Sequence, residues 1–141
     1  MNEDIIQESL RAHLAAYGPL ADLVGQRIYA DQIPENAPRP AMAIFRISRT
    51  EGQSKLGRAN YIDSLMQITI SGDEKGDVRK AADALRDALL PPGGYRGPMG
   101  AGSFVVEVLD ITSDNEADLF DHESQLYYRH CDYTITHRYK G

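Results

Sequence analysis

Two segments of the chain carry largely apolar residues at every third or fourth position, which is the spacing of one face of an α-helix. The first set is Ile6, Leu10, His13, Leu14 and Tyr17, and the second is Val78, Ala81, Ala82, Leu85 and Leu89. Asn2 and Asp77 are suitable N-cap residues, and both segments end at glycine and proline residues that stop a helix. The pattern therefore predicts two amphipathic helices.

Alternating apolar and polar residues predict strands in much of the remaining chain. The expected strands are residues 27–29, 41–49, 61–71, 104–112 and 126–139. The three prolines between residues 34 and 40 favour an extended connection before the second strand. The segments 50–60, 93–102 and 113–121 are expected to be loops, and residues 19–24 a short turn.

This order of elements predicts an α+β fold in a single domain, residues 1–141, with a mainly antiparallel sheet and two helices packed on one face. Strands joined by loops without a crossover helix are expected to run antiparallel. The residues expected to be buried between the helices and the sheet are Leu10, Leu14, Leu85, Leu89, Ile68, Ile70 and Ile135.

Composition narrows the range of functions. The 141-residue chain has a net charge of −6 and a pI near 5.1, and its 15 lysines and arginines are dispersed rather than clustered. This balance argues against tight binding to nucleic acid or to an anionic membrane surface. No apolar run approaches the roughly 20 residues of a membrane helix, and the acidic N-terminus lacks the regions of a signal peptide. Cys131, the single cysteine, cannot form an internal disulfide.

The groups that suggest chemistry lack the spacing that each reaction requires. The glycine-rich segment 93–102 follows a predicted helix and precedes a predicted strand, which is the reverse of a phosphate-binding loop. The histidines and Cys131 do not have the spacing of metal ligands. The run Asp121-His122-Glu123-Ser124 contains the residue types of a catalytic triad, but consecutive residues cannot adopt triad geometry. We therefore predict no catalytic, cofactor-binding or metal-binding residue.

Several short motifs, in order along nearly the whole chain, resemble those of a known protein family. They are Leu10-Arg11-Ala12-His13-Leu14-Ala15-Ala16, Leu20-Ala21-Asp22-Leu23-Val24-Gly25-Gln26-Arg27-Ile28-Tyr29, the proline-bounded passage 34–40, the strand–helix unit 68–89, Asp118-Leu119-Phe120, Leu126-Tyr127-Tyr128-Arg129 and Asp132-Tyr133-Thr134-Ile135. The chain is similar to the tail-completion proteins of long-tailed phages and prophages, which are also called tail-to-head joining or tail-terminator proteins.

The resemblance implies a structural protein of the virion that is not an enzyme and needs no cofactor. Such proteins assemble as rings, typically hexamers, at the head-proximal end of the tail. The implied partners are other copies of the chain, the tail tube protein and the head connector protein, and DNA passes through the lumen without tight binding. Assembly is expected in the host cytoplasm, with no membrane partner.

A ring subunit also needs loops that dock onto the tail tube and the connector. The polar loop 50–60 and the glycine-rich loop 93–102 are the two candidates, and the residues expected to dock are Gln53, Lys55, Leu56, Arg58, Tyr95, Arg96 and Met99. Two alternatives from the residues alone are a generic α+β module that binds a partner, in a non-viral or head-closure role, and, less favoured, a small enzyme. A ring in solution distinguishes the first from a monomeric module, and a pocket with convergent polar groups identifies an enzyme.

Overall fold

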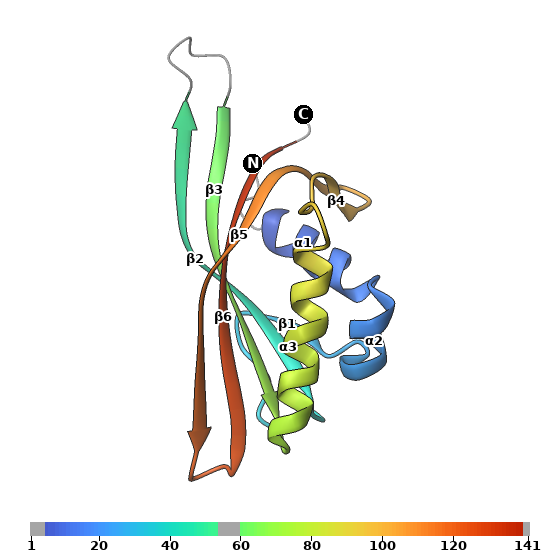
Figure 1. The fold of residues 1–141 in the computed structure, drawn as a ribbon, viewed down its shortest axis with the longest axis vertical. Helices are drawn as coiled ribbons and strands as arrows, with labels where there is room; N and C mark the ends of the chain where they lie inside the picture. The colour runs from blue at the N-terminus through green and yellow to red at the C-terminus, as the bar shows by residue number, and fades with distance from the viewer. Residues whose placement is uncertain (1–4, 54–59, 140–141) are drawn as a thin grey trace.

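The computed structural model describes residues 5–53 and 60–139, which form three helices and six strands (Figure 1). In chain order these are α1 (Ile5–Ala15), α2 (Gly18–Val24), β1 (Ile28–Ala30), β2 (Ala41–Gln53), β3 (Asn60–Gly72), α3 (Lys75–Leu89), β4 (Gly97–Ala101), β5 (Phe104–Asp121) and β6 (Leu126–Tyr139). The predicted α+β class is confirmed. The count of two helices is too low, because Pro19 lies at the start of α2 and the turn expected there is a short helix.

The strands form one sheet in the order β1-β2-β3-β6-β5-β4. Strand β1 runs parallel to β2, whereas all the other neighbouring strands are antiparallel. The sheet is therefore mixed: it is mainly antiparallel, as predicted, and the exception is the parallel pairing of β1 with β2. The physical reason is the connection 31–40, which is long enough to carry the chain back so that β2 starts beside β1 and runs in the same direction.

All three segments expected to be loops contain strand residues; in the segment 50–60, residues 50–53 continue β2 and Asn60 begins β3. Residues 113–121 continue β5 and pair with β6 as far as Asp121, which lies opposite Leu126. Part of the glycine-rich segment is β4, and Met99 in this strand pairs with Val106 of β5. Gly100 permits the tight return, since its φ is +117° and a Cβ there would lie 1.9 Å from the Phe104 carbonyl oxygen. The N-cap of α3 is Glu74 rather than Asp77.

The helices lie together on one side of the curled sheet in Figure 1, and the hydrophobic core fills the space between. All seven residues that the sequence places in the core belong to one buried cluster and have no exposed surface; they are Leu10, Leu14, Ile68, Ile70, Leu85, Leu89 and Ile135. Burial of side chains of this size stabilises the fold by about 1.5–3 kcal/mol each. The opposite face of the sheet is left without a helix layer.

Candidate docking surface

The long strands form two hairpins that extend toward opposite ends of the molecule (Figure 1). The β2–β3 hairpin is paired as far as Gln53 opposite Asn60, and the β5–β6 hairpin as far as Asp121 opposite Leu126. The three helices lie between these ends. The molecule is therefore elongated and presents a different hairpin at each end.

The sheet face away from the helices carries a row of polar cross-strand contacts. Thr69 Oγ1 lies 2.9 Å from His130 Nδ1, and the Gln67 amide donates to the Asp132 carboxylate at 3.2 Å. Two threonine hydroxyls donate in the same way, Thr136 to Asp63 and Thr134 to Asp114. Because side chains alternate between faces along a strand, the buried neighbours of these residues point to the core. We call this surface the open face.

Carboxylates are concentrated on the open face. Asp63, Asp114 and Asp132 belong to three adjacent strands and take part in the contacts above. Asp110 lies opposite Thr136 in the register of β5 and β6. The fixed charges of these four residues make this part of the face negative.

The helix side of the β5–β6 hairpin holds a small ionic cluster. The Arg129 guanidinium lies 2.7 Å from the Asp118 carboxylate and 3.6 Å from that of Glu116, which in turn lies 3.6 Å from Arg86 of α3. The hydrogen bond from Arg129 to Asp118 raises the pKa of the guanidinium. Exposed pairs of this kind contribute about 0–1 kcal/mol each, so the cluster orients the hairpin against α3 more than it stabilises it.

Cys131 and Asp121, two of the titratable residues considered for chemistry in the sequence, are in environments that serve the fold. Burial raises the pKa of the Cys131 thiol to about 12. Asp121 accepts hydrogen bonds from the Ser124 hydroxyl at 2.8 Å and the Glu123 amide at 3.1 Å, and these lower its pKa. The triad-like run is thus a capped turn. Across residues 5–53 and 60–139, no three His, Cys, Asp or Glu side chains come together in a way that could hold a metal ion.

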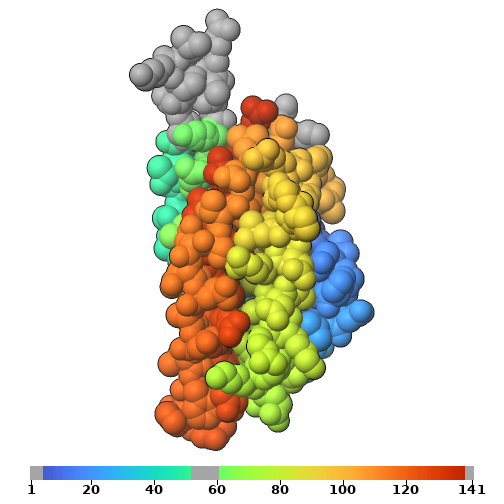
Figure 2. Space-filling view, in the orientation of Figure 1, coloured from blue at the N-terminus to red at the C-terminus, as the bar shows by residue number. Residues whose placement is uncertain are grey.

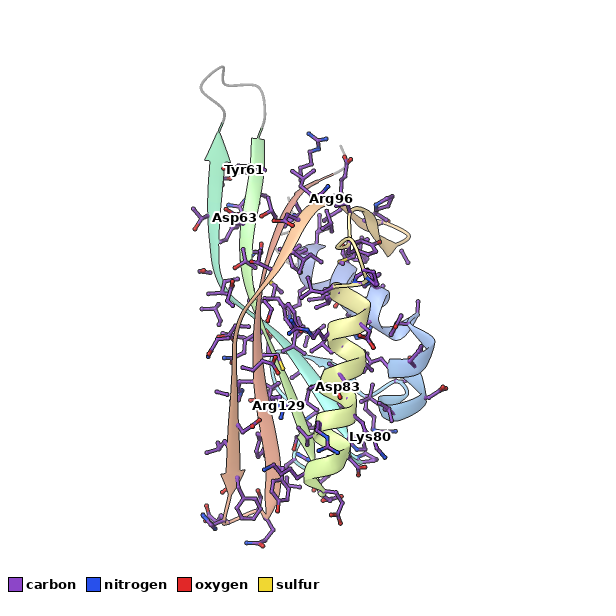
Figure 3. All side chains as sticks on the ribbon, in the orientation of Figure 1. Tyr61, Asp63, Lys80, Asp83, Arg96 and Arg129 are labelled. Carbon is purple, nitrogen blue, oxygen red and sulfur yellow. The ribbon has the colours of Figure 1, made fainter. Side chains whose placement is uncertain are left out.

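The predicted docking residues of the glycine-rich segment differ in their exposure to solvent. Arg96 is exposed, and Figure 3 places it toward the end of the molecule where the β2–β3 hairpin projects. Tyr95 is half-buried: its ring centroid lies 4.6 Å from that of His13, and its hydroxyl donates to the Pro98 carbonyl. Met99 is only 1% exposed, because the alternation of β4 turns it into the core against Val106. Its expected position on an exposed docking loop was therefore wrong.

The other predicted docking loop lies largely beyond the described part of the chain. Lys55, Leu56 and Arg58 fall within residues 54–59, outside the described residues. Gln53 is the last residue of β2, and only its backbone is described. The assignment of these four residues to docking stays a prediction.

Sequence reasoning missed a groove on the open face. This groove, with a volume of about 600 Å³, lies between the connection that follows β1 and the end of the β5–β6 hairpin. Its lining includes Ile33, Leu119, Tyr128 and His130. These residues are up to about a hundred positions apart, and they come together through the pairing of β2 with β3 and of β6 with both β3 and β5.

Comparison with known proteins identifies the family. The sequence matches the family described as Tail completion protein gp17 over residues 8–138. The chain belongs to this family. Tail completion proteins are structural proteins of phage tails, so the resemblance seen in the sequence is confirmed, and with it the assignment to a structural tail protein.

A solved structure shares the fold. A chain in the structure titled "Virion of native gene transfer agent (GTA) particle" is similar with a TM-score of 0.65 at 14% sequence identity. The similarity covers 97% of this chain and 99% of the other. A comparison with curated protein sequences gives no match. No helix in the described part of the chain is both long and apolar enough to cross a membrane.

Proposed function

We propose that this tail completion protein forms a ring, a hexamer, at the head-proximal end of the tail, where it joins the tail tube protein to the head connector protein. The observation that carries the proposal is the family match over residues 8–138. The shape supports it, since an elongated subunit with different hairpins at its two ends can contact one partner at each end (Figure 1). The chain acts in the virion after assembly in the host cytoplasm. The role requires neither catalysis nor a cofactor.

The open face is the part of the subunit that we assign to the lumen. Three carboxylates on adjacent strands, Asp63, Asp114 and Asp132, are held by hydroxyl and amide donors, so they keep fixed positions at neutral pH. A wall with this charge repels the phosphates of DNA and leaves the DNA free to move. The helices would then face away from the axis.

Docking to one partner is assigned to the end that carries Arg96 and Tyr95. These two residues directly precede β4, and the β2–β3 hairpin projects toward the end of the molecule where Figure 3 places Arg96. Arg96 supplies an exposed charge that can be removed without disturbing the core. Arg96→Ala is therefore expected to weaken joining while leaving thermal stability unchanged.

A complementation experiment tests the proposal. Cells that produce all other particle proteins but lack this chain should accumulate heads and separate tails, and supplying the chain should restore joined particles. Arg96→Ala should lower the yield of joined particles, whereas Lys80→Ala, an exposed position on the outer surface of α3 (Figure 3), should not. Joined particles in the absence of the chain would overturn the proposed function.

A separate set of variants tests whether the open face lines the lumen of the ring. Replacing Asp63, Asp114 and Asp132 by Asn removes three charges with little change in shape. The triple variant should still join heads to tails but should slow DNA ejection, because the DNA is repelled less. Asp83→Asn on the outer side of α3 serves as the control. Unchanged ejection by the triple variant, with the ring present, would exclude the open face from the lumen.

A further inference from the structure

Two long strand edges of the sheet have no partner among the described residues. Strand β1 pairs with β2 only from Met42 to Ile44, so the outer edge of β2 is free from Phe45 onward. Strand β4 pairs with β5 only as far as Val108, so the outer edge of β5 is free beyond that residue, up to the turn. Each edge is longer than the strand that covers its beginning. Free edges of this length present rows of backbone donors and acceptors and are templates for pairing with another chain.

The free part of β5 is visible on the surface. Figure 2 shows β5 as a continuous column beside α3 that reaches from the upper part of the molecule to the tip of its hairpin. The two free edges lie on opposite sides of the sheet order, since the four long strands run β2-β3-β6-β5. A single subunit therefore cannot pair its own two edges, but the β2 edge of one copy can meet the β5 edge of the next.

The charges on the two edges are opposite in sign. Between Asp110 and Asp121 the chain has five acidic residues and no lysine or arginine. The β2 edge carries Arg46 and Arg49, of which Arg49 also lies 3.0 Å from Glu51. Pairing of two β5 edges would bring acids together, and pairing of two β2 edges would bring arginines together. The pattern favours contact between unlike edges.

Contact between unlike edges is heterologous, and a heterologous contact forms a ring when its repeated rotation returns to the first copy. A symmetric dimer through one edge would instead require that edge to pair with the same edge of the second copy. The charge pattern on the two edges thus matches the kind of symmetry that a ring needs.

The faces of the two edges also correspond. Arg46 lies opposite Met66 and Glu116 opposite Cys131, and both of these partners are core residues, so Arg46 and Glu116 are on the helix side of the sheet. Phe45 directly precedes Arg46, so its side chain lies on the open face. Leu119 also lies on the open face, where it lines the groove. A sheet continued from one copy to the next would therefore bring arginine near carboxylate on one side and apolar side chains together on the other.

The exposed apolar side chains support this arrangement. In the described residues four large hydrophobic side chains are exposed, and three of them lie on the free edges: Phe45 at 46%, Ile47 at 43% and Leu119 at 55%. Cross-strand apolar and opposite-charge pairs contribute about 0.2–1 kcal/mol each relative to alanine pairs, in addition to the backbone hydrogen bonds. The groups that remain exposed in one subunit are thus the groups that a neighbouring strand would cover.

We propose that copies of this chain join edge to edge, the free edge of β2 in one subunit pairing with the free edge of β5 in the next. This inference rests on the ring assembly proposed above and assigns its subunit contact. The sheets of neighbouring subunits then form one continuous wall with the open faces on the same side.

A charge exchange tests the contact. One variant carries Arg46→Glu and Arg49→Glu on the β2 edge, and the other carries Glu116→Lys and Asp118→Lys on the β5 edge. Each variant alone should reduce the fraction of tails that bear a ring, seen by electron microscopy, at least about tenfold, because like charges meet at every contact. An equal mixture should restore the rings, since alternating copies in a ring with an even number of subunits place unlike charges at every contact.

The controls separate charge from folding. Lys80→Glu on α3 makes a comparable charge change away from both edges and should leave the rings intact. Thermal unfolding shows whether each variant is folded. Rings formed by both single-edge variants, or no recovery in a mixture of folded variants, would overturn the edge contact. If the wild-type chain gives no rings and no joined particles, the proposed function itself fails.

A second variant does not depend on charge. Phe45→Cys and Leu119→Cys in one chain place a thiol on each edge, while the native Cys131 is only 1% exposed and does not react. Mild oxidation of assembled tails should give a ladder of linked copies that ends at the size of the ring. Phe45→Cys alone should give no ladder. If the double variant forms visible rings but gives no ladder of linked copies on oxidation, the two edges are not in contact.

Discussion

His137 is completely buried and should make the stability of the fold depend on pH. Its Nε2 lies 3.0 Å from the Ser64 hydroxyl oxygen. Burial is the largest cause that lowers the pKa of the imidazole, nearby Arg49 and Arg46 also lower it, and Asp63 opposes the change, so that the net pKa is about 4. In the unfolded chain the pKa returns to 6.5. The unfolded state therefore binds a proton more readily, and protonation favours unfolding.

The contribution of His137 to the free energy of unfolding can be calculated from its pKa values in the folded and unfolded states. A difference of about 2.5 corresponds to about 3 kcal/mol, since each pH unit is worth 1.36 kcal/mol. This stability is fully present above the unfolded value of 6.5 and is lost as the pH falls toward about 4. Between pH 7.5 and 4.5, His137 should account for a loss of about 2–3 kcal/mol in the free energy of unfolding.

Urea denaturation of the wild type and His137→Gln over this pH range measures the effect. Glutamine can still hydrogen-bond to the Ser64 hydroxyl, but it does not titrate. The carboxylates contribute equally to both proteins, so the difference between the two curves isolates His137. The variant should lose clearly less stability on acidification than the wild type. Parallel curves would refute the assignment of a neutral, buried imidazole.

Two other predictions concern the core and the β4–β5 turn. Leu85→Ala should cost about 2–5 kcal/mol, because the side chain has no exposed surface and its loss leaves a cavity, whereas the exposed control Arg79→Ala should stay within about 0.5 kcal/mol of the wild type in the same denaturation. Gly100→Ala should destabilise by at least about 1–3 kcal/mol through backbone strain alone, since the added Cβ would also collide with the Phe104 carbonyl oxygen; Gly76→Ala in α3, where nothing lies within 4 Å, should be neutral or stabilising. A Leu85→Ala cost below about 1 kcal/mol, or equal effects at the two glycines, would contradict these assignments.

The elements with one apolar face were predictable from the sequence. Helices α1 and α3 and strands β2, β3 and β6 each bury one side, so their apolar residues follow the helical or strand period. The C-terminal half of β5 was not predicted as a strand, because residues 114–119 are exposed and show no alternation of apolar residues. This part of β5 is held by its pairing with β6 and by contacts such as that of Asp118 with Arg129, which depend on residues distant in sequence.

The candidate surfaces were predictable only in part. The excess of acids was evident in the composition, but their gathering on the open face depends on the register of three strands and on two bulges in β5. Met99 was misplaced because glycine-rich sequence indicates a loop, whereas the positive φ values of Gly97 and Gly100 allow a strand that turns Met99 inward. The free edges could not be predicted from the sequence. An edge is free when no other strand pairs beside it, and this depends on the order of all the strands in the sheet.

Cryo-electron microscopy of the neck of a complete particle would show directly where this chain lies and how it is oriented. We expect a ring of six copies of this fold between the tail tube and the head connector, with Asp63, Asp114 and Asp132 facing the channel and the helices facing outward. A particle in which the chain is absent from the neck, or lies elsewhere in the tail, would contradict it.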